Sequence, residues 1–194
     1  MPGIGAWAIL SPPEQQGKDH HDIRMALVHL RRITADNEQE CLGLRVDDAQ
    51  ASFVATNAQS MAQARANPRL VPLGVYDRAA RGYLQPRVPL VGFAMYEIDC
   101  GVGLILRLMI DRAHQRKGYG RAALLEVMRR LRLEPEVEMI VTSHRHDNAV
   151  VAALFRSLGF VPWELEGIAL KPGEVYLRLP DGRWLLPALS SGLG

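Results

Sequence analysis

The stretch from residue 104 to residue 131 places a buried-strand pattern, a glycine-containing turn and a helix pattern in direct succession. Leu104 to Ile110 is apolar apart from Arg107, which is typical of a strand inside a sheet. After Gly118, apolar residues recur with helical spacing until Pro135. These apolar positions are Leu124, Leu125, Met128 and Leu131. The succession predicts a mixed α/β (α+β) fold in which the turn is the candidate site.

The turn carries both glycine and positive charge. A strand that enters a helix through the sequence QRKGYG leaves several backbone N–H groups without intrahelical partners. Glycine lets a ligand approach the backbone closely, and the helix dipole adds positive potential. Further positive charge comes from Arg112, His114, Arg116, Lys117 and Arg121. We therefore expect an anion such as a pyrophosphate here, in preference to a loop of merely solvated basic residues.

Two common phosphate-binding motifs do not fit this turn. A P-loop needs GxxxxGK with Ser or Thr, and the dinucleotide fingerprint needs GxGxxG, whereas Gly120 is followed by Arg121, Ala122 and Ala123. QRKGYG instead resembles the (Gln/Arg)-x-x-Gly-x-(Gly/Ala) signature of the GNAT family of N-acetyltransferases, which cradles the pyrophosphate of acetyl-coenzyme A (acetyl-CoA). The resemblance implies acetyl-CoA binding by Gln115, Arg116, Lys117, Gly118, Tyr119, Gly120 and Arg121.

A second segment, NAVVAALFRSLGF, begins at Asn148 and predicts a helix that stops at a left-handed Gly159. Its expected apolar positions are Val150, Val151, Leu154, Phe155 and Leu158, with Phe160 behind the stop. The segment resembles the second signature of the same family, whose Asn and early helix face lie beside coenzyme A. Asn148 and Phe155 are thus implied cofactor contacts, although the family usually has a tyrosine, which protonates the leaving thiolate, where this chain has Phe155.

The resemblance covers approximately residues 26–179 and implies a mixed sheet that splays apart at its central strand. Acetyl-CoA would lie in the split, with its pantetheine along the strand edge at Leu108, Met109 and Ile110. A narrower resemblance to bacterial diamine, spermine and spermidine N-acetyltransferases lies in residues 47–64 and in the strands VGFAMY and LRLMID. It implies substrate contacts at Asp48, Gln50, Phe53 and Tyr96.

Acetylation requires a neutral amine, whereas an alkylamine has a pKa of about 10.4. Glu97, at the end of the strand before the central one, is the first candidate for the proton acceptor, and His144 is the second. A surface carboxylate at a strand end and a loop histidine are the competing interpretations. The thiolate would leave unaided, or Ser157, Tyr119 or a water would replace the tyrosine. No metal is expected, because His144 and His146 lack a third ligand nearby.

The leading hypothesis is a direct, acetyl-CoA-dependent N-acetyltransferase acting on a small cationic amine, most plausibly a polyamine or diamine. The alternatives are acetylation of a protein amino group or an amino-bearing antibiotic, and a non-catalytic acyl-CoA-binding module permitted by Phe155. The formal net charge of +2 gives no reason to expect nucleic-acid or membrane binding. Two distant cysteines favour a reduced, cytoplasmic setting. A homodimer is left open.

The remaining patterns predict one domain over residues 25–180, between a poorly ordered extension (1–24) and a tail (181–194). Met25 is a candidate translation start. Expected strands lie at 26–33, 73–76, 91–98, 139–143 and 174–179, with a flap over 77–89. One expected helix is capped by Thr34 and continues to Val46, and another is capped by Asn57 or Ser60 and stopped by Asn67-Pro68.

Overall fold

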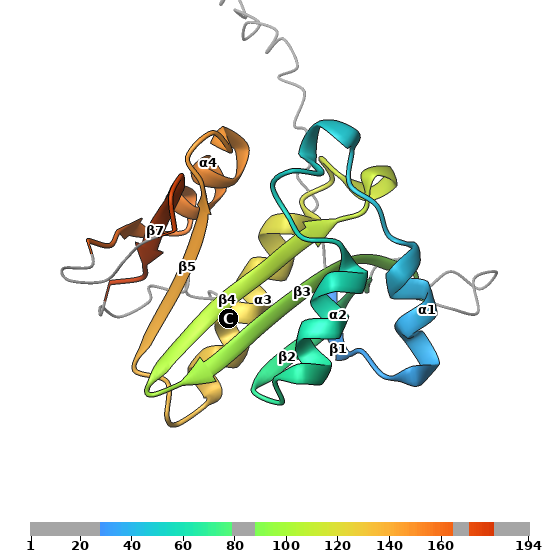
Figure 1. Cartoon of the computed structure of the whole chain (residues 1–194), viewed down its shortest axis with the longest axis horizontal. Coiled ribbons are helices and arrows are strands. Elements are labelled where there is room, and N and C mark those ends of the chain that lie inside the picture. Colours follow the sequence, from blue (N-terminus) through green and yellow to red (C-terminus); the bar gives the residue numbers. More distant parts are fainter. Residues whose placement is uncertain (1–27, 79–87, 165–170, 181–194) are drawn as a thin grey trace, which may run out of the picture.

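The computed structural model describes residues 28–78, 88–164 and 171–180, and a mixed seven-stranded sheet forms its frame (Figure 1). The strands lie side by side in the order β1-β2-β3-β4-β5-β7-β6. Their bounds are Val28–Arg32 (β1), Leu70–Asp77 (β2), Leu90–Asp99 (β3), Val102–Ile110 (β4), Met139–Arg145 (β5), Val161–Pro162 (β6) and Glu174–Arg178 (β7). Neighbouring strands are antiparallel except β4 and β5, which are parallel.

Helices cover both faces of the sheet. Helix α3 (Tyr119–Leu133) lies behind the sheet in Figure 1, and α1 (Ala35–Gly43) and α2 (Asn57–Ala66) lie in front of it. Helix α4 (Ala149–Ser157) follows β5, and two short 3-10 turns, η1 (Asp48–Gln50) and η2 (Arg112–His114), complete the elements. Within these described parts, no helix is long and apolar enough to cross a membrane.

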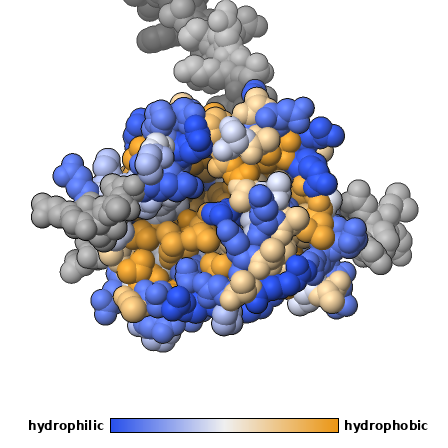
Figure 2. Space-filling view, in the orientation of Figure 1, coloured by the Kyte–Doolittle hydropathy of each residue, from blue (hydrophilic) through white to orange (hydrophobic). Residues whose placement is uncertain are grey.

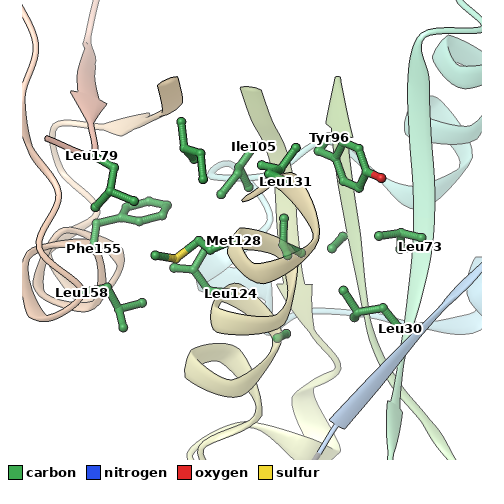
Figure 3. Close-up of a cluster of buried hydrophobic side chains, with 14 of the residues drawn as sticks. Leu30, Leu73, Tyr96, Ile105, Leu124, Met128, Leu131, Phe155, Leu158 and Leu179 are labelled. Carbon is green, nitrogen blue, oxygen red and sulfur yellow. The ribbon is translucent and has the colours of Figure 1, made fainter. Parts of the chain in front are cut away.

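Each face of the sheet has its own hydrophobic core. The core on the α3 face includes Leu73, Ile105, Leu124, Met128 and Leu131, and Phe155 of α4 and Leu158 directly after this helix close it (Figure 3). The core on the α1 and α2 face includes Cys41, Met61, Phe93, Met95 and Met109. Side chains of β3 and β4 alternate between the two cores, as a central strand requires.

The sheet opens between β4 and β5. Their register pairs Val102 to Ile105 with Met139 to Thr142, and β4 continues to Ile110 and β5 to Arg145 without further pairing. At the last pair, the Thr142 hydroxyl donates a hydrogen bond to the Ile105 carbonyl at 2.9 Å. Figure 1 shows the two strands diverging above this point. The expected splayed sheet is therefore confirmed, and we call the closed end of the split its apex.

Most expected elements are present, three details are wrong and one short strand was missed. Helix α1 ends at Gly43 and does not continue to Val46. Helix α2 is capped by Thr56, whose hydroxyl accepts from Gln59 N, and not by Asn57 or Ser60. Val150 is 76% exposed and does not belong to the apolar face of α4. The short β6 was not expected, because two residues carry no periodic signal.

Several expectations concern parts of the chain outside the described residues. These are the N-terminal extension with Met25, the central part of the flap and the C-terminal tail. The domain boundaries at 25 and 180 stay predictions for the same reason.

Candidate functional site

The turn between β4 and α3 presents backbone donors at the mouth of the split. Arg116 and Gly118 have φ values of 61° and 83°, and Gly118 is the N-cap of α3. The first intrahelical bond runs from Ala122 N to Gly118 O at 3.1 Å. The N–H groups of Tyr119, Gly120 and Arg121 precede that bond and point out of the helix start, where the helix dipole is positive. Such a turn can bind a diphosphate.

Two basic side chains of the turn are held by neighbouring groups. Lys117 Nζ donates to Ala113 O at 2.9 Å, within the turn itself. Arg121 Nη1 donates to Ser157 Oγ at 2.8 Å and so reaches α4 on the other side of the split. Arg121 therefore links the turn to α4 across the opening of the split, whereas Lys117 stays within the turn.

The segment between α1 and α2 is bonded directly to the turn. Gln115 Nε2 donates to Gln50 Oε1 at 2.7 Å and to Ile110 O at 3.0 Å. Arg45 N donates to Asp111 Oδ2 at 2.9 Å, and Arg112 N donates to Arg45 O at 2.8 Å. Gln115, an implied cofactor residue, and Gln50, an implied substrate residue, are thus in contact.

The free edge of β4 offers main-chain groups along the split. The register with β3 pairs Met95 with Arg107 and Tyr96 with Ile105, so Leu106 forms a bulge. Asp111 N donates to Val91 O, which fixes the alternation above the bulge. Backbone groups of Asp111 and Met109 face β3, and those of Leu108 and Ile110 face the split. Leu108 and Ile110 suit pantetheine contacts, whereas Met109 faces β3 through its backbone.

Comparison with known proteins agrees with this geometry. The model of the acetyltransferase (GNAT) family matches residues 52–160, more than half of the chain. The chain belongs to the GNAT acetyltransferase family. A search of curated protein sequences gives no significant match.

Solved structures share the GNAT fold at low identity. The ribosomal-protein-S18-alanine N-acetyltransferase of Escherichia coli is 16% identical, with a TM-score of 0.58 over 87% of this chain and 99% of that one. The spermidine N-acetyltransferase of Vibrio cholerae, solved with CoA and spermine, is 15% identical, with a TM-score of 0.55 over 78% and 92%. NAA60 of Arabidopsis thaliana is 15% identical, with a TM-score of 0.55 over 78% and 98%. These likenesses establish the fold.

The two candidate proton acceptors of this GNAT chain lie on opposite faces of the sheet. Glu97, level with Leu104 of β4, lies on the α2 face, where its Oε1 accepts from Asn67 Nδ2 at 3.0 Å and from Arg69 Nε at 3.1 Å. The ring of His144 stacks on Phe155 with centroids 6.2 Å apart, on the α4 face. The structure therefore does not bring them together, and their catalytic roles stay predictions.

Two aromatic residues that were expected to contact ligands lie in the core. Phe155 is 4% exposed and packs edge-on against Phe160, with centroids 5.2 Å apart. Tyr96 is 6% exposed and belongs to the core on the α3 face, where burial raises the pKa of its hydroxyl (Figure 3). Asn148 caps α4, and its Oδ1 accepts from Val151 N at 3.2 Å. Both rings thus pack in the core, and the ligand contacts implied for Phe155 and Tyr96 stay predictions.

The hydroxyl groups that could replace the missing tyrosine are already bonded. Tyr119 donates to Asp77 Oδ2 at 2.7 Å, and burial, together with this hydrogen bond and the carboxylate charge, raises the Tyr119 pKa to about 12. A phenol with such a pKa is a poor proton donor to a thiolate. Ser157 Oγ donates to Leu154 O at 2.7 Å. Neither residue is poised to protonate a leaving group.

The front of the split is bounded by residues that the sequence analysis partly missed. Phe53 lies under the guanidinium of Arg145, which is 6.0 Å from its ring centroid, so the α1–α2 segment faces β5. Asp48 is exposed on η1. In Figure 2 hydrophobic residues line the hollow between this segment and the β5–α4 side. Ser143, Glu174 and Arg107 form a polar group at the apex. The described residues contain no cluster of metal-ligating side chains.

Proposed function

We propose that this GNAT chain transfers the acetyl group of acetyl-CoA directly to a primary amine of a small cationic substrate, most plausibly a polyamine or diamine such as spermidine or spermine. The observation that carries the proposal is the N-terminal turn of α3, which presents outward N–H groups beside the open edge of β4.

The turn before α3 and the free edge of β4 are the proposed binding groups for acetyl-CoA from its diphosphate to its thioester. The diphosphate would accept from the N–H groups of Tyr119, Gly120 and Arg121. Pantetheine amides would pair with the split-facing backbone of Leu108 and Ile110, as an added strand pairs with a sheet edge. The thioester would then lie near the apex, where β4 and β5 close at Ile105 and Thr142.

The reaction needs attack by a neutral amine nitrogen on the thioester carbonyl carbon. A C–N bond forms, the C–S bond breaks, and the amine proton passes to a carboxylate, a histidine or a water. Glu97 and His144 are our candidates for this proton. Since Tyr119 and Ser157 are bonded elsewhere, we propose that the thiolate leaves without a side-chain acid, which a thiol pKa near 8.5 permits.

The acceptor class rests on the loop resemblance and on a neighbour solved with spermine. Another neighbour is named for a ribosomal-protein alanine, so a protein amino group is the second candidate. Both classes present a primary ammonium that must be attracted and deprotonated. A discriminating assay follows thiol release from acetyl-CoA with spermidine, spermine, diamines, N-terminal peptides and aminoglycosides. The highest kcat/KM identifies the class.

Calorimetry with acetyl-CoA tests the cofactor part independently. If acetyl-CoA binds but no amine in the panel releases thiol, the transferase proposal fails and the non-catalytic alternative stands.

A further inference from the structure

A polar group occupies the apex of the split on the α2 face. Ser143 directly follows Thr142, the last residue of β5 that pairs with β4. Glu174 Oε2 accepts a hydrogen bond from Ser143 Oγ, which brings its carboxylate to this position from β7. Arg107 lies across the split on β4, and its Nη2 donates to Gln63 Oε1 of α2 at 3.3 Å. Acceptor and thioester would meet at this level.

Glu174 is a half-buried carboxylate that stays ionised. Its side chain is 18% exposed. Although burial alone would raise its pKa, hydrogen bonds from Ser143 and Lys171 and the positive charges of Lys171 and Arg107 hold the pKa of Glu174 below its ordinary value. A carboxylate with a lowered pKa is a weak base but a strong partner for a cation. Its chemistry therefore favours binding an ammonium over accepting its proton.

Lys171 shows how a primary alkylammonium meets this carboxylate. Its Nζ donates to Glu174 Oε1 at 2.9 Å, while its side chain is 73% exposed. An exposed ion pair of this kind contributes little free energy and is easily exchanged. An ionised carboxylate has about four acceptor positions, so two hydrogen bonds leave room for another donor. A substrate ammonium can therefore share the carboxylate or displace Lys171.

We infer that Glu174, oriented by Ser143, is the acceptor-binding residue that holds the ammonium form of the substrate amine at the apex of the split, and that Lys171 competes for this carboxylate. The inference rests on the proposed acetyltransferase function and names the group that selects a cationic acceptor. Arg107, Lys171 and Arg145 all act on this carboxylate with positive charge, so the substrate ammonium has to compete with these neighbours for it.

The first test compares Glu174→Gln with Glu136→Gln, which alters an exposed carboxylate after α3. With the best amine from the panel, Glu174→Gln should raise KM for the amine about tenfold or more, because one charge-assisted hydrogen bond is lost. The dissociation constant of acetyl-CoA from calorimetry should stay within twofold. Glu136→Gln should match the wild type in both quantities. An unchanged amine KM in Glu174→Gln would overturn the inference.

Two further variants separate binding from a structural role. Lys171→Ala should lower the amine KM, since a competing ammonium is removed, and an unchanged or raised KM would count against the inference. Ser143→Ala should raise the Glu174 pKa, because the Ser143 hydrogen bond favours the ionised form. The loss of amine affinity on acidification should then begin at higher pH than in the wild type. Identical pH profiles would contradict the assigned role of Ser143.

The outcome is distinguishable from failure of the proposed function. If wild-type protein releases no thiol with any amine, the function itself is refuted. If the wild type is active and Glu174→Gln keeps its amine KM, only the assignment of Glu174 falls. Circular dichroism and thermal unfolding of each variant identify any change caused by loss of folding.

Discussion

At the scale of single residues, Tyr119 and Phe155 show that position in a motif does not fix a side chain's role. Phe155 occupies the family's tyrosine position, yet its ring is buried between His144 and Phe160. Tyr119 belongs to the diphosphate turn, yet its hydroxyl leaves the turn and binds Asp77 at the end of β2. The backbone N–H of Tyr119 is a proposed ligand contact, whereas its side chain forms a hydrogen bond within the fold.

Tyr119→Phe should therefore change the pH dependence of stability. The Tyr119 pKa is raised from 10 to about 12 in the folded state, so its contribution is fully present below pH 10 and is lost as pH rises from 10 towards 12. Near pH 8 the variant should be less stable by about 1.5–3 kcal/mol, the usual value of a hydrogen bond to a charged group.

Urea unfolding at pH 8 and at pH 11 measures this difference. It should shrink at pH 11, since only the wild type loses the Tyr119 contribution. A stability difference that is equal at both values would refute the assigned hydrogen bond. Tyr76 and Tyr96 are present in both proteins and cancel in the comparison.

At the scale of elements, the start of α3 depends on two glycines with different tasks. Gly118 has a φ of 83°, which an L side chain adopts only at a cost. Gly120 lies inside the first helical turn, where an added Cβ would be 3.8 Å from Ile110 Cγ1 and 4.0 Å from Leu154 Cδ2, which is ordinary contact. The first glycine sets the backbone, and the second tolerates a methyl group.

Gly118→Ala should destabilise the protein by about 1–2 kcal/mol and weaken acetyl-CoA binding, because the N–H groups that follow it are displaced. Gly120→Ala is the matched control and should retain both properties, since alanine favours helix by up to about 1 kcal/mol. Thermal unfolding and calorimetry with acetyl-CoA report the two quantities. Equal losses of affinity in both variants would show that the left-handed backbone of Gly118 is not required.

The sequence predicted helices and strands correctly where an apolar periodicity is bounded by residues that start or stop an element, such as glycine. The run at 104–110, the helix after Gly118 and the stop at Gly159, whose φ is 86°, all appear as expected. The apex group was missed, because Ser143 and Glu174 are 31 residues apart and only the pairing of β5 with β7 brings them together. Val150 was wrongly assigned to the buried face of α4, since helical periodicity does not show how much of the helix surface the rest of the protein covers.

At the scale of the whole molecule, hydrogen bonds connect the turn between β4 and α3 to the segment between α1 and α2. Gln115 binds Gln50, and Asp111 binds the backbone of Arg45. We therefore expect a ligand that orders the turn to order residues 44–56 as well. A ligand that binds only the folded state raises the free energy of unfolding by about 2.7 kcal/mol when the ligand concentration is 100 times Kd.

Hydrogen exchange measures this connection. Acetyl-CoA should slow amide exchange at 44–56 as well as in the turn, and Gln115→Leu should reduce the protection of 44–56 more than that of α3. Gln39→Leu, an exposed position on α1, is the control and should preserve the wild-type pattern. If 44–56 is protected equally in Gln115→Leu, the side-chain bond does not transmit ligand binding.

The hydrogen bond from the Thr142 hydroxyl to the Ile105 carbonyl marks how far a ligand can enter between β4 and β5. An extended ligand that entered the split would lie between the main chains of β4 and β5 and would end at this contact. The number of paired residues in β4 and β5 therefore sets the depth of the split. Substitutions of side chains on the outer surface should leave this depth unchanged.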